Sequence, residues 1–237
     1  MTFTAVSPAI ADGPVVVFGG TFNPVHFGHL RSALELGERL SLPQVRLMPS
    51  ARPALRDAPE CSAEHRAAMV ELALAGEAGI VCDRRELARP GMSYSVDSLQ
   101  GLRRELGAGR SISLVLGYDA LLQLNRWHRW RELLAFGHLL VIARPGWSLP
   151  DDGEIADWLA QHRATGWPQL RDQPCGQVLI EELRPLDIAA SDIRALLAAG
   201  RSARYLLPDS VLGYIEEYSL YRPAAMLAGM DNELDGC

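Results

Sequence analysis

The sequence predicts an α/β protein with a Rossmann-like, doubly wound parallel sheet. Short apolar runs rich in β-branched residues recur along the chain, and stretches with helical spacing separate most of them. Strands that alternate with helices form mainly parallel sheets with helices on both faces. In addition, two glycines end the first apolar run, where the carboxyl end of a strand opens onto a ligand site in such sheets.

The apolar runs predict six strands. They lie at residues 15–18, 45–48, 80–82, 112–116, 139–142 and 178–180. Between the first two, apolar residues from Leu30 to Gly37 keep helical spacing, and Val96 to Leu106 do so before the fourth strand. The order of strand and helix therefore favours crossover connections and a parallel sheet.

The second half of the chain is less regular. Residues 144–176 are richer in Pro, Gly, Asp and Trp, which indicates a loop-bearing insertion with one short helix around residues 155–162. A further helix is expected from Ser191, with Gly200 as its C-terminal stop, and a last helix begins after Pro208. With 237 residues, the chain is interpreted as an N-terminal extension (1–13), a single domain (14–222) and a loose C-terminal tail (223–237).

The amino-acid composition limits the classes of partner that the chain could bind. Hydrophobic residues are 48% and charged residues 22%, as in globular proteins with a sizeable core. The net charge of −6 argues against a general nucleic-acid binder, and no apolar run is long enough to span a membrane. No charged leader and no C-x-x-C pair occur, so we expect a cytoplasmic protein with reduced thiols. The oligomeric state stays open.

Lysine is absent. All 23 basic residues are arginine, which excludes a Walker A lysine, a Schiff-base lysine and the strand lysine of protein kinases. Phosphate must therefore be held by arginine, histidine and backbone N–H groups.

Residues 19–29, with the sequence GGTFNPVHFGH, carry the strongest chemical signal. Glycines allow close approach of the backbone to a ligand, and the free N–H groups of a helix N-terminus attract anions. His26 and His29 would lie at such a terminus, which suggests phosphate chemistry. A tight turn with a helix-capping or zinc-binding histidine pair is the alternative. Zinc needs a third protein ligand, and the other histidines form no cluster in the sequence, so no metal site is expected.

Residues 19–29 resemble the first signature, GGTFDPxHxGH, of the nucleotidyltransferase superfamily, whose fold is a doubly wound parallel sheet. Residues 188–194, IAASDIR, resemble its second signature, ISSTxIR. Independently, Ser191 suits a helix N-terminus and Arg194 can fork onto phosphate oxygens. A plain capped helix with a solvated arginine is the alternative for this segment alone.

Three middle segments resemble those of bacterial nicotinate mononucleotide adenylyltransferases. They are residues 89–99 (RPGMSYSVDSL), residues 116–119 with the following Trp127 and Trp130, and residues 143–146 (ARPG). Together with both signatures they extend in the same order over nearly the whole chain. The resemblance implies transfer of the adenylyl group of ATP to nicotinate mononucleotide, which gives nicotinic acid adenine dinucleotide and pyrophosphate in NAD biosynthesis.

The resemblance also implies residue roles. Catalytic roles are implied for His29, His26 and Arg194. ATP binding is implied for Gly19, Gly20, Thr21, Phe22, Gly117, Asp119, Ser191 and Arg194. Binding of nicotinate mononucleotide is implied for Asn23, Arg56, Tyr94, Ser95 and Trp127. Mg²⁺ is expected to arrive with ATP, with no protein cage of its own.

Several of these residues have a structural alternative. Trp127 and Trp130 could be core aromatics on one helix face, and Asp119 and Ser95 could be helix caps. Arg56 could be a solvated loop arginine.

The chain also departs from the family pattern at four positions. They are Asn23 in place of aspartate, Leu55 in place of histidine, and Ala189 and Ala190 in place of serines. These departures keep open a catalytically weak nucleotide-binding module. Another adenylyl- or cytidylyltransferase of the superfamily is a second alternative, against which residues 93–97 and Trp127 argue.

Overall fold

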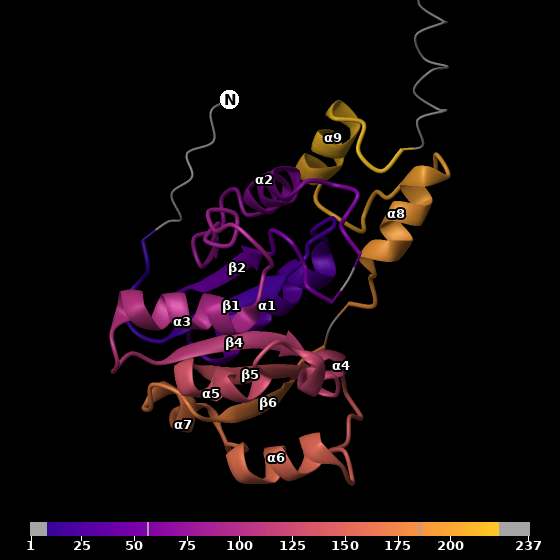
Figure 1. The fold of residues 1–237 in the computed structure, drawn as a ribbon. Helices are drawn as coiled ribbons and strands as arrows, with labels where there is room; N and C mark the ends of the chain where they lie inside the picture. The colour runs from indigo at the N-terminus through magenta and orange to yellow at the C-terminus, as the bar shows by residue number, and fades with distance from the viewer. Residues whose placement is uncertain (1–8, 56, 185, 223–237) are drawn as a thin grey trace, which may run out of the picture.

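The computed structural model describes residues 9–55, 57–184 and 186–222, which form one six-stranded sheet with helices on both sides (Figure 1). All neighbouring strands are parallel, in the order β3-β2-β1-β4-β5-β6. The strands are β1 (Val15–Gly20), β2 (Val45–Pro49), β3 (Ile80–Cys82), β4 (Ile112–Gly117), β5 (His138–Ala143) and β6 (Val178–Glu182). The doubly wound parallel sheet and all six predicted strands are confirmed.

The predicted helices are also present. They are α1 (Phe27–Arg39), α3 (Ser95–Leu106), α6 (Glu154–His162), α8 (Ala190–Ala198) and α9 (Asp209–Glu217). The expected insertion holds α6 and a second short helix, α7 (Trp167–Arg171). Short turns α4 (Tyr118–Leu121), η1 (Leu124–Arg126), η2 (Trp130–Glu132) and α5 (Leu133–Phe136) connect β4 to β5.

Helix α2 (Ala63–Ala73) was not anticipated from the sequence. It buries five consecutive residues, from Arg66 to Val70, because it is covered by β2 and β3 on one side and by α9 on the other. A helix that is buried around its circumference shows no single apolar stripe, so its sequence lacks the 3.6-residue period that identified the other helices.

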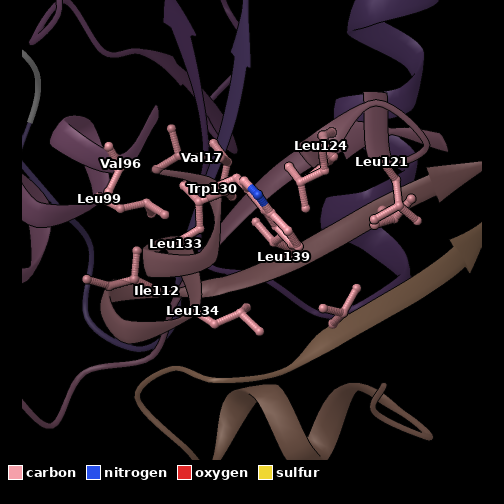
Figure 2. Close-up of a cluster of buried hydrophobic side chains, with 14 of the residues drawn as sticks. Val17, Val96, Leu99, Ile112, Leu121, Leu124, Trp130, Leu133, Leu134 and Leu139 are labelled. Carbon is pink, nitrogen blue, oxygen red and sulfur yellow. The ribbon is translucent and has the colours of Figure 1, made fainter. Parts of the chain in front are cut away.

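The sheet separates the hydrophobic core into clusters on its two faces. Along β1, Val15 and Val17 face the cluster under α3, and Val16 faces the one under α1, because successive strand residues point to opposite faces. Figure 2 shows the first cluster, in which Trp130 packs among leucines from α5 and β5. Trp130 also makes an edge contact with the ring of Trp158 on α6, at 5.3 Å between ring centroids.

The strand order creates a switch point between β1 and β4. From β1 the chain proceeds outward to β2 and β3, and then returns to β4 on the other side of β1. Phe18 is paired with Val115, so Gly20 and Gly117 end the two neighbouring strands at the same level. Ligands of open α/β sheets bind in the crevice at this position.

The predicted boundaries of the domain stay predictions, because residues 1–8 and 223–237 lie outside the described part of the chain. Among the described helices, none is long and apolar enough to cross a membrane.

Candidate active site

The turn after β1 folds tightly back on itself. Phe22 has a φ of 47° and only 1% of its surface is exposed, because its ring turns back over Gly20. A Cβ atom at Gly20 would lie 2.9 Å from that ring, which no other residue could accommodate without a shift. Glycine at position 20 therefore lets a buried phenylalanine anchor the segment that leads to α1.

His26 and His29 are held as a stacked pair at the start of α1. His26 is the N-cap residue and His29 lies in the first turn, with 3.7 Å between their ring centroids. The edge of Phe22 packs on His29 at 5.0 Å between centroids. A Cβ atom at Gly28 would lie 2.9 Å from Nδ1 of His26. The glycine at position 28 therefore makes room for the imidazole stack.

Both imidazoles are neutral at physiological pH. Burial lowers the pKa of His26 to about 4, and burial together with the neighbouring His26 lowers the pKa of His29 to about 3. The Nδ1 atoms of both rings are buried and have no hydrogen-bond partner among the described residues. Buried polar atoms are normally paired, so an unpartnered pair at a helix N-terminus marks this turn as a functional site.

This burial predicts a dependence of stability on pH. The folded-state pKa values of His26 and His29 lie below the unfolded value of 6.5, so the unfolded state binds more protons between about pH 6.5 and pH 4. We expect the free energy of unfolding in urea to be highest above pH 6.5 and to fall as the pH is lowered toward 4. His29→Asn, which does not titrate, should weaken this fall; an identical pH dependence in the variant would contradict the assignment.

The second signature segment lies against the first. Nη1 of Arg194, on α8, donates to the backbone carbonyl of Asn23 at 2.8 Å, across 171 positions of sequence. The hydroxyl of Tyr221 donates to Oδ1 of Asn23 at 2.7 Å. Asn23 thus has its side-chain oxygen engaged within the protein.

Ser191 lies in the first turn of α8 but does not cap it. The helix begins at Ala190, its N-cap residue is Ala189, and no side chain caps it. The Ser191 hydroxyl is exposed and donates to the carboxylate of Asp192 at 3.2 Å. The free N–H groups of this turn, close to Arg194, are left for a ligand.

Gly117 and Asp119 lie at the end of β4 and the start of α4. Gly117 is the N-cap residue of α4 and is exposed, and Asp119 is exposed in the first turn. The alternative that Asp119 caps this helix is wrong, because the N-cap position is occupied by Gly117 and no side chain accepts its N–H groups. A carboxylate at this position is accessible from the crevice between β1 and β4.

The start of α3 forms the other end of the crevice. Tyr94 is its N-cap residue and Ser95 its first helical residue, so Ser95 is not the cap. The Tyr94 carbonyl accepts from the N–H groups of Asp97 and Ser98, so the N–H groups of Ser95 and Val96 are the ones left for a ligand in this turn. The Tyr94 ring packs on His128, with centroids 4.2 Å apart, and this contact links α3 to the loop that carries Trp127.

The two tryptophans have different surroundings. Trp130 is a core residue with 6% exposure, so the core alternative is right for it. Trp127 ends η1, is only half buried, and keeps a surface that a ligand could reach. Arg56 lies outside the described residues, and its neighbour Leu55 is exposed.

Two cavities of the described residues lie away from the turn after β1. One of about 460 Å³ lies between α2 and α9, and one of about 390 Å³ lies near Gly13 and Arg110. Neither of these two cavities is lined by a residue of the turn after β1. Within the described ranges, no group of three or more His, Cys, Asp or Glu side chains could hold a metal ion.

Sequence reasoning missed two residues of this region. Arg66 on α2 donates to the carbonyl of Thr21 at 2.6 Å, and Tyr221 contacts Asn23 as described. Arg66 interrupts a stretch of mostly small and apolar residues, which is the one signal that could have revealed it. Nothing in the sequence indicates Tyr221.

Comparison with known proteins gives consistent results. Residues 17–196 match the family model described as cytidylyltransferase-like. A protein of Cellvibrio japonicus, named "Probable nicotinate-nucleotide adenylyltransferase", is 50% identical over 207 residues, which cover 87% of this chain and 97% of that protein. A protein of the same name from Pseudomonas entomophila is 47% identical over 217 residues, with 92% and 99% covered.

A solved structure agrees in fold. The Plasmodium falciparum nicotinic acid mononucleotide adenylyltransferase complexed with NaAD superposes with a TM-score of 0.65 at 16% identity, covering 88% of this chain and 97% of that chain.

Proposed function

Because this chain belongs to the nicotinate-nucleotide adenylyltransferase family, we propose that it transfers the adenylyl group of ATP to nicotinate mononucleotide at the turn after β1. The products are nicotinic acid adenine dinucleotide and pyrophosphate, in NAD biosynthesis. The observation that carries the site is the pair of neutral, stacked imidazoles at the N-terminus of α1, whose Nδ1 atoms lack protein partners among the described residues.

The reaction needs alignment and charge stabilisation rather than a strong base. The phosphate of the mononucleotide is already ionised near neutral pH. One of its oxygens attacks the α-phosphorus of ATP while the bond to the β-phosphate breaks and pyrophosphate leaves. An N–H of the neutral His29 imidazole donates to an α-phosphate oxygen as charge accumulates there, and His26 assists in phosphate binding.

The ATP end of the crevice combines both signatures. Gly19, Gly20, Thr21 and Phe22 would line the phosphates with backbone. Arg194 and the first turn of α8 at Ser191 would hold the leaving pyrophosphate, since a guanidinium forks onto phosphate oxygens. The exposed Asp119, beside Gly117, would accept hydrogen bonds from the ribose hydroxyls. Mg²⁺ would enter with ATP as part of the substrate and would help to neutralise the phosphate charge, with no protein cage of its own.

The nicotinate end is proposed at the start of α3. The N–H groups of Ser95 and Val96 would donate to the nicotinate carboxylate, as anions bind at helix N-termini. Trp127 would stack on the pyridine ring, and Tyr94 would support the same wall. Asn23 and Arg56 complete the proposed contacts to this substrate. Nicotinamide mononucleotide has an amide in place of this carboxylate. Its NH₂ group is a donor, and the backbone N–H groups of the helix start have no acceptor to offer it.

The partners that follow from this reaction are two small molecules, ATP and nicotinate mononucleotide. We also propose that the protein works in the cytoplasm, where ATP is abundant and where the thiols of Cys61, Cys82 and Cys175, all free in the structure, stay reduced.

A pyrophosphate-release assay tests the function. Purified protein with ATP and Mg²⁺ should release pyrophosphate in the presence of nicotinate mononucleotide, and more slowly with nicotinamide mononucleotide. CTP in place of ATP should give little product, which separates the proposal from the cytidylyltransferase alternative. Tight ATP binding without pyrophosphate release would identify a catalytically weak nucleotide-binding module instead.

A further inference from the structure

Arg66 is a buried charge that binds backbone rather than acid. None of its surface is exposed, and its guanidinium donates to three carbonyls: Nη1 to Thr21 at 2.6 Å, Nη2 to Ala51 at 3.2 Å and Nε to Cys61 at 3.2 Å. Within the described part of the chain it forms no ion pair with a carboxylate. One side chain thus fastens three separate segments: the turn after β1, the loop after β2 and the lead into α2.

The bonds from Arg66 continue toward the nicotinate end. The N–H groups of Ala51 and Arg52 donate to the hydroxyl of Ser93 at 2.9 and 3.2 Å, and the Ser93 N–H donates to the Arg52 carbonyl at 2.8 Å. Ser93 immediately precedes Tyr94 and Ser95 at the start of α3. A continuous path of hydrogen bonds therefore runs from the turn of the histidine pair, through Arg66 and Ala51, to the start of α3.

Burial of the Arg66 charge costs free energy, and the geometry that its guanidinium imposes on its three partners explains why the charge is there. A buried charge loses its hydration, and apolar residues of similar size often stabilise a core as well or better. The planar guanidinium places several donors in a fixed fork, which neither lysine nor an apolar side chain reproduces. Three carbonyls from three segments can satisfy that fork only when the segments hold one relative position.

We propose that Arg66 is a positioning residue that holds the ATP turn and the nicotinate end of the crevice at the separation that in-line attack requires. The proposal rests on the function assigned above. Arg66 touches neither substrate; it acts through the carbonyls of Thr21 and Ala51. Since a displacement of about 1 Å between reacting groups can reduce the rate about 100-fold, losing the fork should reduce kcat more than substrate binding.

Kinetics of Arg66→Lys and Arg66→Met test the proposal, with Arg46→Met as the matched control. Arg46 is also a buried arginine, but its Nε pairs with Asp83 at 2.9 Å, away from the crevice. We expect kcat of the Arg66 variants to fall about 100-fold, with KM for each substrate within about threefold of the wild type. The control should lower Tm and leave kcat unchanged. Equal losses of kcat in the Arg46 and Arg66 variants at matched Tm would overturn the proposal.

Amide hydrogen exchange provides a readout that does not depend on activity. In the Arg66 variants, exchange should become faster in residues 20–23 and 50–53 together, and in the Arg46 variant it should not. Unchanged exchange in both segments overturns the positioning role, whether or not the wild type is active. An inactive wild type whose Arg66 variants still show faster exchange in both segments would overturn the proposed function alone.

Ser93→Ala removes the next link of the same path and leaves the Arg66 fork in place, and it also removes a hydrogen bond to the buried side chain of Glu86. If neither Arg66 variant folds, this variant decides: kcat should fall while KM values stay within about threefold, and an unchanged kcat overturns the proposal. Where Arg66→Lys folds, the double variant with Ser93→Ala should lose less than the product of the two single losses, because both act on one path.

Discussion

Replacement of His29 with alanine is expected to lower kcat by about 10²–10³-fold, the usual cost of removing one preorganised donor from a developing oxyanion. The imidazole is neutral because burial and His26 lower its pKa to about 3, so it acts as a fixed N–H donor in a partly desolvated site. Its stack against His26 and its edge contact with Phe22 fix the ring before substrate arrives. No reorganisation is then needed as charge builds on the α-phosphate.

The fold should survive this substitution. The His29 Nδ1 atom has no partner among the described residues, so the variant removes an unsatisfied polar group along with some ring packing. Steady-state kinetics with both substrates, together with urea unfolding, measure the two effects separately. His65→Ala is a matched control, since His65 also lies in a helix but bonds to the Tyr214 hydroxyl at 2.8 Å. A turnover number close to that of the wild type would remove His29 from the mechanism.

The effect of His26→Ala should be smaller. The His26 ring stacks on His29 from the N-cap position of α1, so its loss should loosen the ring that donates rather than remove the donor itself. This difference is the expected kinetic sign that His29 carries more of the chemistry than His26.

Replacement of Arg194 with alanine is expected to lower kcat/KM for ATP by about 100-fold. Arg194 has two tasks in the proposed site. Its Nη1 donates to the Asn23 carbonyl and so fixes the turn, and in the proposal the other donors of its fork would bind the triphosphate. Arg194→Lys keeps the charge but cannot make both contacts at once, so it should recover only part of the loss.

The dependence of the rate on ATP concentration measures this effect at saturating nicotinate mononucleotide. Arg201→Ala is the control, since Arg201 is an exposed arginine just beyond the end of the same helix. An Arg194→Ala enzyme with unchanged kcat/KM for ATP would show that the second signature segment only supports the turn.

The local pattern of apolar residues in the sequence was sufficient to predict most of the strands and helices. The strands were identifiable because each is a short, continuous apolar run, as expected for a parallel sheet covered on both faces. The position of the site followed from two facts of the sequence, the glycine pair that ends the first strand and the two histidines at the start of the following helix. The three-residue spacing of His26 and His29 places both rings on one side of the first turn, so their stack follows from local geometry.

Helix α2 and the two tryptophans show what the local sequence pattern could not predict. The apolar residues of α2 surround the helix, and only the packing of β2, β3 and α9 on it explains why they are buried. Trp127 and Trp130 lie three positions apart in the sequence, yet Trp130 is buried against Trp158 while Trp127 packs on the same cluster and stays partly exposed. Which of them can reach a ligand depends on the turns between β4 and β5.

The sequence by itself therefore indicated the six strands, the candidate phosphate-binding turn and the reaction class, because these depend on neighbours in sequence. Only the tertiary structure decided what depends on distant neighbours. Burial among segments far apart lowers the pKa values of His26 and His29, and the Arg194 bond to Asn23 spans 171 positions. The three carbonyls that bind Arg66 likewise meet only when three loops of the folded chain converge on one guanidinium.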